Sequence, residues 1–165
     1  MTAKAFSFSI DLPVMNQWRN VDLLRTSVQN CFVAVFADLD GCNAIAMVTG
    51  ELVENAIKYG DWGADDKSFR LLVHGKPGVV NIQVDNPVAV GSSAVAELQN
   101  TLRWIESQPS AQDAFLAKML EIASRRPPTG ASGLGLVRCA YEANAKLRSE
   151  LVNATTLRVT AEMQF

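Results

Sequence analysis

The chain has 165 residues and a formal net charge of −2, with 48% hydrophobic and 19% charged residues. This length and composition predict a single folded domain over residues 1–165 and exclude a disordered chain. The balanced charge contains no long basic block, which excludes the electrostatic surface expected of a nucleic-acid-binding protein.

The pattern of apolar residues predicts, in chain order, a strand, two helices, a hairpin, a helical insertion, a helix and a second hairpin. The expected elements are a strand over 6–12, helices over 21–36 and 43–59, strands SFRLLVHG and VVNIQVDNP, helices over 92–107, 110–125 and 134–146, and strands LRSELV and TLRVTAEMQF. Turns are expected at 38–43, 76–78 and 153–155. Hairpins rather than alternating βα units predict a two-layer α/β sandwich, in which helices cover one face of a mixed, mostly antiparallel sheet.

The cysteines and the N-terminal sequence indicate where the protein works. Three cysteines without a C-x-x-C spacing predict neither a disulfide framework nor a structural zinc site, and they favour a reduced, cytoplasmic setting. The segment MTAKAFSFSIDLP lacks a signal-peptide core, and the longest apolar run, CFVAVFA, is closed by Asp38 and Asp40. We therefore expect neither export nor a membrane span.

The two helices before the first hairpin have predicted core stripes. In the first helix the stripe consists of Leu24, Val28, Cys31 and Val35, and in the second of Ile45, Val48, Leu52, Ala56 and Tyr59. In the second helix Glu51, Asn55 and Lys58 fall within an arc of about 60° beside the stripe, whereas Glu54 and Asp61 lie on the opposite side. The first three polar side chains are therefore expected at the edge of the core, where a cleft can open.

These polar residues have two interpretations. In the first, Glu54 and Lys58 form a surface i,i+4 pair, and Glu51 and Asn55 are simply solvated. In the second, the Asn55 amide oxygen is a hard ligand for Mg²⁺, and the Glu51 carboxylate takes a proton from an attacking hydroxyl.

The segment TGASGLGL, residues 129–136, places three glycines at the predicted start of a helix. Glycines let backbone amides approach an anion closely, and a helix N-terminus favours negative charge, so a phosphate chain can bind there. The segment does not follow a strand and has no Lys-Ser pair, which excludes a dinucleotide fingerprint and a P-loop. An ordinary loop before a helix is the alternative interpretation.

Together, ELVENAIKYG and TGASGLGL, separated by a hairpin and a helical insertion, resemble the two conserved boxes of the GHKL, or Bergerat-fold, ATP-binding superfamily. This superfamily includes histidine-kinase catalytic domains and anti-sigma-factor serine kinases. The resemblance covers most of the chain in element order. It implies ATP and Mg²⁺ as cofactors and a helical lid at about 91–129.

The resemblance also implies roles for particular residues. Glu51 would be the general base, Asn55 the Mg²⁺ ligand and Lys58 a neighbour of the phosphates. The second glycine box would consist of Gly130, Ser132, Gly133 and Gly135. Arg125 or Arg126 would reach the γ-phosphate, unless these arginines only favour a helix C-terminus.

The first glycine box departs from the family pattern D-x-G-x-G. Its place is taken by VDNPVAVG, in which Asp85 would contact the adenine, but Pro87 and Ala89 occupy the glycine positions. Because proline fixes φ and lacks an amide donor, the adenine side of the pocket must be shaped differently. Residues 85–87 can alternatively be a strand-ending turn.

The resemblance to stand-alone anti-sigma kinases implies transfer of the ATP γ-phosphate to a serine of a partner protein, an anti-sigma antagonist or a sigma-factor-like protein. The single histidine, His74, falls in a predicted strand, which argues against a phosphoacceptor role. A non-catalytic partner-binding module with weak or lost nucleotide binding is the alternative. A small-molecule enzyme has the least support, since no Ser-His-Asp set or metal cluster is found. Partner contacts are expected on the first helix and the lid, and a homodimer is possible by analogy with the family.

Overall fold

The computed structural model describes residues 5–13, 21–34, 39–63, 67–76, 78–124 and 133–165. The described elements follow the expected order. They are β1 (Phe6–Pro13), α1 (Val21–Val33), α2 (Leu39–Tyr59), β2 (Ser68–Lys76), β3 (Val79–Pro87), α3 (Ser93–Ser107), α4 (Ala111–Ser124), α5 (Leu134–Glu142), β4 (Lys146–Asn153) and β5 (Thr156–Gln164). None of the described helices is both long and apolar enough to cross a membrane.

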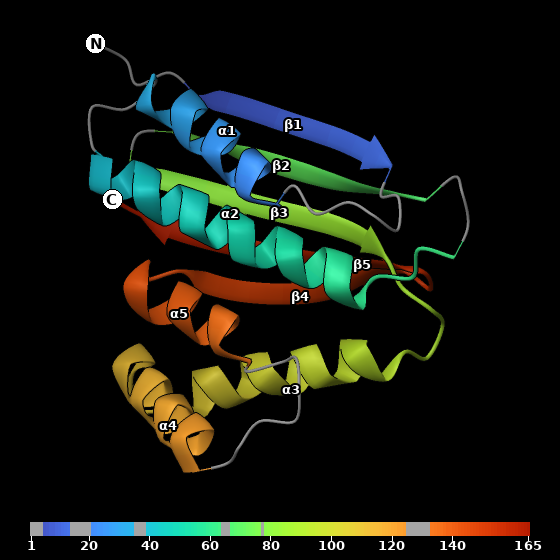
Figure 1. Ribbon diagram of the computed structural model, residues 1–165, viewed down its shortest axis with the longest axis vertical. Helices are drawn as coiled ribbons and strands as arrows, with labels where there is room; N and C mark the ends of the chain where they lie inside the picture. The colour runs from blue at the N-terminus through green and yellow to red at the C-terminus, as the bar shows by residue number, and fades with distance from the viewer. Residues whose placement is uncertain (1–4, 14–20, 35–38, 64–66, 77, 125–132) are drawn as a thin grey trace.

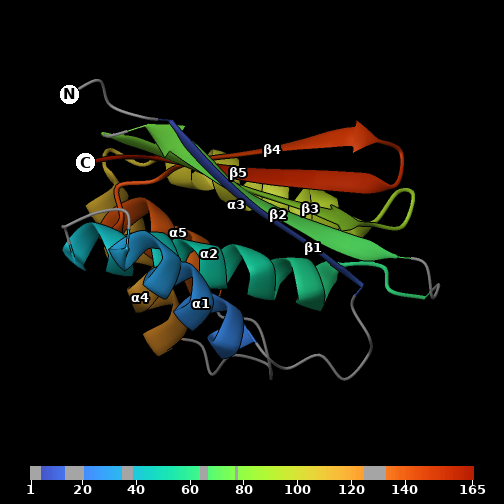
Figure 2. The same cartoon turned by 90° about the horizontal axis from the view of Figure 1, so that it is seen from above.

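The five described strands form one sheet in the order β1-β2-β3-β5-β4, and every pairing between them is antiparallel. Figure 1 shows α1, α2 and α5 in front of this sheet and α3 and α4 beyond β4, and Figure 2 shows the strands as one layer with α1, α2, α4 and α5 below it. The predicted two-layer α/β sandwich is therefore confirmed. The parallel component that a mixed sheet would contain is not found among the described strands.

The core lies between the sheet and the helices because each central strand alternates buried and partly exposed residues. In β3, Val80, Ile82 and Val84 are at most 1% exposed and point toward the helices. The residues between them point to the other face of the sheet, which the helices leave open. Most side chains on the open face are polar, as expected for an antiparallel sheet with one solvated side.

The predicted stripe of α2 is largely correct. Ile45, Val48, Leu52 and Ala56 are all at most 5% exposed, but Tyr59 is 42% exposed because the helix ends there. In α1, Leu24 and Val28 are buried as predicted, while Cys31 is exposed and Phe32 is buried in its place. The ring of Phe32 packs edge-on against Phe6 of β1, with centroids 5.5 Å apart. Val35 lies outside the described residues.

Three helix boundaries differ from the predictions by three residues or more. Helix α1 ends at Val33 rather than near 36. The turn predicted at 38–43 is wrong from Leu39 onward, because α2 begins there; Asp40 in its first turn suits the positive helix N-terminus, and Cys42 is fully buried. Helix α5 ends at Glu142 rather than near 146. Asn144 takes a left-handed conformation with φ 48°, and the amide of Ala145 donates to the carbonyl of Cys139, which closes the helix.

Candidate nucleotide site

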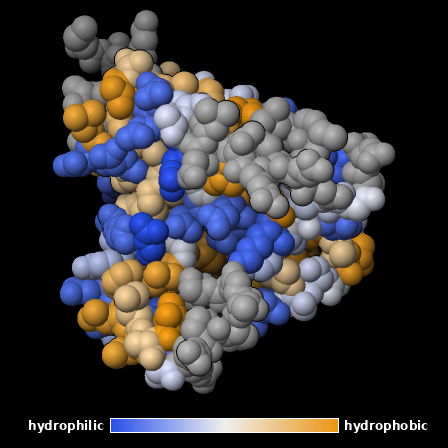
Figure 3. Space-filling view, viewed as in Figure 1, coloured by the Kyte–Doolittle hydropathy of each residue, from blue (hydrophilic) through white to orange (hydrophobic). Residues whose placement is uncertain are grey.

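Two adjoining cavities lie between α2, α3 and α5. The larger one, about 310 Å³, is lined mainly by polar side chains, and the smaller one, about 30 Å³, is lined mainly by apolar ones. Five residues line both: Asn55, Tyr59, Ala94, Leu98 and Leu136. In Figure 3 hydrophilic side chains gather across the middle of this helix-covered face. A ligand in the polar cavity would therefore have an apolar wall at one end, at the mouth of the smaller cavity.

Glu51 is held at the border of the polar cavity by α5. Its side chain is 22% exposed, and Arg138 Nη1 donates to its Oε1 over 3.1 Å. Gly135 packs so closely against Oε2 that a Cβ at this glycine would overlap the carboxylate. Burial raises the pKa of Glu51, and the charge of Arg138 opposes that rise. A partly desolvated carboxylate in a cavity wall suits a group that accepts a proton.

Arg138 is itself fixed by a second carboxylate one helical turn further along α5. Its Nε and Nη2 donate to the two oxygens of Glu142 over 3.0 and 3.2 Å. The hydrogen bond to Glu142 is the main reason why the pKa of Arg138 is raised. The guanidinium is therefore preorganised to hold Glu51 in one position.

Asn55 lies one turn after Glu51, at the junction of the two cavities. Its side chain is half-buried, and no hydrogen bond to its amide is found among the described residues. An amide oxygen in this position remains available for a ligand. Lys58, one turn later, is exposed and lines the same cavity, with Nζ 5.4 Å from the ring centroid of Tyr59. Glu54, expected on the opposite side of the helix, is exposed but also reaches the cavity wall.

The N-terminus of α5 forms the opposite wall. Gly133 occupies the N-cap position with φ 62°, a conformation that favours glycine, and Gly135 lies in the first turn. Lys118 of α4 reaches this point, since a Cβ on Gly133 would lie 3.3 Å from Lys118 Nζ. The helix N-terminus and the ammonium group together favour an anion. The predicted residues Gly130 and Ser132, together with Arg125 and Arg126, lie outside the described residues.

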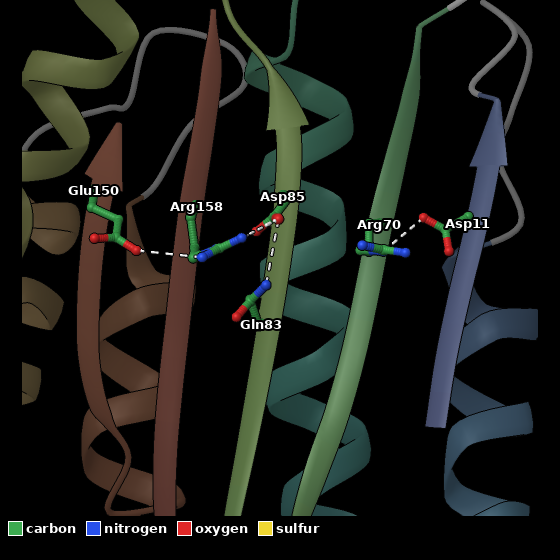
Figure 4. Close-up of polar contacts among 6 residues, drawn as sticks. All are labelled: Asp11, Arg70, Gln83, Asp85, Glu150 and Arg158. Carbon is green, nitrogen blue, oxygen red and sulfur yellow. Dashed lines mark hydrogen bonds and ion pairs between the residues drawn. The ribbon is translucent and has the colours of Figure 1, made fainter. Parts of the chain in front are cut away.

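Asp85 is not brought to this site. It belongs to β3 rather than to a turn, and its side chain lies on the open face of the sheet. There Arg158 Nε and Nη2 donate to its two carboxylate oxygens, each over 2.8 Å (Figure 4). The neighbouring Asn86 points the other way, is 3% exposed and lines the apolar cavity. Its Nδ2 donates to the carbonyl of Pro87 over 3.2 Å, while its Oδ1 has no hydrogen-bond donor among the described residues.

Three residues at the site were not predicted from the sequence. Asn86 could have been found from the alternation of Ile82, Val84 and Asn86, because every second residue of a strand shares a face. Arg138 lies three residues after Gly135, a spacing that puts both on one side of a helix. No sequence signal predicts Lys118, because its place depends on how α4 folds back.

The site fits Mg²⁺ only as an ion shared with a phosphate ligand. Among the described residues no group of three or more His, Cys, Asp or Glu side chains could hold a metal by itself. Mg²⁺ commonly uses one or two protein oxygens, substrate phosphates and waters. The amide oxygen of Asn55, for which no hydrogen-bond donor is found in the part of the chain that the structure describes, is suited to be such a protein ligand.

Comparison with models of known protein families gives no match for this chain, and comparison with curated protein sequences gives none either. Function must therefore be inferred from the chemistry of the two cavities.

Proposed function

We propose that this protein is a cytoplasmic Mg·ATP-binding regulator of the GHKL type that transfers the γ-phosphate to a serine of a partner protein. The observation that carries the proposal is the join between an apolar cavity and a polar cavity at Asn55. None of the described cysteines forms a disulfide, which is consistent with a reducing setting.

The apolar cavity has walls suited to a flat heteroaromatic base, but its volume of about 30 Å³ is close to that of a single water molecule, so the surrounding side chains would have to move apart to admit one. Leu52, Val88, Leu136 and other aliphatic side chains line it, and Asn86 supplies an amide at its wall. The unpaired Oδ1 of Asn86 would accept a hydrogen bond from an amino group such as that of adenine.

The polar cavity suits a phosphate chain. The N-terminus of α5, Lys58 and Lys118 supply positive potential on two of its walls. When bound, Mg²⁺ would neutralise phosphate charge near Asn55. The carboxylates of Glu51, Glu54 and Glu97 line the same cavity, so the metal would also offset their repulsion of the phosphates.

In the proposed transfer step, Glu51 acts as the general base. The partner's serine oxygen attacks the γ-phosphorus, its proton passes to the Glu51 carboxylate, and the bond between the γ-phosphorus and the bridging oxygen of ADP breaks. Arg138 keeps Glu51 in position for this step. In such reactions the protein contributes mainly positioning and charge stabilisation.

A non-catalytic partner-binding module is the second candidate. It is favoured by Pro87 and Ala89 in place of glycines, and by the engagement of Asp85 with Arg158 on the far face of the sheet. The second feature leaves the base side of the site without a carboxylate, since among the described residues the Asn86 amide is the polar side chain at the apolar cavity other than Asn55 and Tyr59.

Calorimetric titration of Mg·ATP distinguishes nucleotide binding from its loss. We expect saturable heat for the natural protein, and at least a tenfold weaker affinity for Asn55→Ala because a metal ligand is lost. Asn81→Ala is the matched control, since Asn81 lies on the open face of the sheet, away from both cavities, and this variant should bind like the natural protein. The absence of heat from the natural protein would rule out the ATP site.

Transfer is tested with ATP labelled at the γ-phosphate and a candidate partner. Labelling of a partner serine is expected, with a loss of about 100-fold or more in Glu51→Gln if Glu51 is the base. Nucleotide binding with no labelling of any partner would favour the non-catalytic module.

A further inference from the structure

The strand β4 forms one edge of the described sheet, and its outer side has no strand partner there. A groove of about 390 Å³ runs beside it, between the strand and α3. Leu147, Arg148 and Ser149 line the groove from the strand, and Leu102 and Arg103 line it from the helix. Figure 1 shows α3 running alongside β4. An added strand would therefore have hydrogen-bonding groups beside it and a helix beneath it.

The sequence of β4 is complementary to itself in reverse. Residues 147–151 read Leu-Arg-Ser-Glu-Leu, so the two leucines are symmetric about Ser149 and the charges on its two sides are opposite in sign. If two copies of β4 pair antiparallel with Ser149 opposite Ser149, each Arg148 faces a Glu150 and each Leu147 faces a Leu151. Such directly opposed pairs are the units that stabilise an antiparallel sheet.

The exposure of these side chains fits this pairing. Glu150 has a side chain 65% exposed and only a long contact with Arg158, whose Nη1 lies 3.6 Å away. Arg148 is exposed, and no ion pair to it is found among the described residues. Leu151 is 48% exposed, although it lies on the helix side of the sheet. Pairing would give Arg148 an opposite charge, give Glu150 a second one beside Arg158, and place Leu151 over the groove of the other copy.

A row of alternating charges crosses the open face of the sheet and ends at Glu150 of β4. Asp11, Arg70, Asp85, Arg158 and Glu150 occupy successive strands in direct register, and their charges alternate from one edge to the other (Figure 4). With the proposed pairing, the next position in this row is Arg148 of the second copy, so the alternation continues across the join. The other edge strand, β1, has Asp11 as its single charged residue, so two copies of β1 could not form pairs of opposite charge with each other.

We infer that β4 is a dimerisation edge, at which two copies of this chain join their sheets into one continuous antiparallel sheet about a two-fold axis at Ser149. The pairing is isologous, so both charge pairs form twice. The contact is confined to one strand and a groove, and the dimer should dissociate on dilution. This inference does not depend on nucleotide binding.

Charge reversal tests the register. Sedimentation equilibrium over a concentration series should show a monomer–dimer equilibrium for the natural protein, weakened about tenfold or more in Arg148→Glu, where two like-charge pairs replace two opposite ones. The double variant Arg148→Glu/Glu150→Arg should restore dimerisation, because its pairs are again opposite in sign. Lys146→Glu is the control, since it makes the same charge change on the same strand but faces Val152 of the second copy.

Crosslinking tests the axis. In a Cys31→Ser background, Ser149→Cys should form a disulfide-linked dimer on mild oxidation, because directly opposed residues have Cα atoms about 4.5–5.5 Å apart. Leu151→Cys should not, because the two copies of residue 151 would be about 13 Å apart. A natural protein that stays monomeric at every concentration would overturn the inference. So would a dimer that neither responds to Arg148→Glu nor crosslinks through Ser149→Cys.

Discussion

Glu51 combines two properties that oppose each other in the folded protein. Its carboxylate is withdrawn from water, which favours the neutral form, and it is bonded to Arg138, which favours the charged form. Burial has the larger effect, so the pKa is raised. The ionised side chain is therefore a source of instability at neutral pH, as is common for groups positioned for chemistry rather than for folding.

The pH dependence of stability should reveal this cost. The folded protein holds the Glu51 proton more tightly than the unfolded chain does. The free energy of unfolding of the natural protein should therefore fall as the pH rises from 4.5, the pKa of this group in the unfolded chain, to its raised pKa in the folded protein. Glu51→Gln cannot lose this proton, so its stability relative to the natural protein should increase over the same window. Arg138 keeps its two hydrogen bonds to Glu142 in the variant.

Thermal unfolding between pH 4 and pH 8 measures this difference. The control is Glu54→Gln, which removes a charge from an exposed position on the same helix. A stability difference for Glu51→Gln that stays constant or shrinks as pH rises would show that burial does not control this carboxyl group.

At the scale of elements, the sheet distributes its polar residues according to strand alternation. Asp85 lies on the open face, where a bidentate bond joins it to Arg158 of β5. Asn86, one residue later, lies on the helix face at the apolar cavity. A shift of one residue thus separates a structural ion pair from a candidate ligand contact.

Asp85→Asn separates these roles experimentally. The change removes the charge from a forked pair whose side chains are 15% and 30% exposed, and it should cost about 1–2 kcal/mol of stability. The unfolding midpoint should then fall by about 3–6 °C, while the affinity for Mg·ATP stays unchanged. Asn86→Leu is the comparison, since it should weaken nucleotide binding. A loss of ATP affinity in Asp85→Asn would restore Asp85 to the base site, as the sequence predicted.

The same alternation explains how much the sequence could predict. Hydrophobic periodicity identified every described helix and strand, and the spacing of Glu51 and Asn55 correctly placed both at one cavity facing the glycines of α5. The exchange of Cys31 for Phe32 in the core could not be predicted, because both fit the helical period and only packing against β1 decides between them. The position of Lys118 depends on tertiary contacts between helices, which local sequence does not encode.

At the scale of the whole molecule, the two layers differ in how firmly they are held. The central strands bury every second residue, whereas α4 buries only Ala114 among its described residues and leaves Leu116, Met119 and Leu120 between 43% and 71% exposed. Its Phe115 ring stacks on Tyr141 of α5, with centroids 5.0 Å apart. Helix α4 is therefore attached mainly through α5, beside the candidate phosphate site.

Hydrogen exchange should resolve this difference. Amides of β3 and β5 should exchange only through global unfolding, whose free energy is about 5–15 kcal/mol in a domain of this kind. Amides of α4 should exchange through a local opening whose free energy is lower by several kcal/mol. Saturating Mg·ATP should slow exchange in α4, because Lys118 would then bridge that helix to the phosphates. Lys118→Ala should remove most of the added protection in α4 while the strands remain as protected as in the natural protein. If the amides of α4 and β3 are equally protected without nucleotide, α4 is not weakly attached. If exchange in α4 is unchanged at saturating Mg·ATP, Lys118 does not contact the bound phosphates.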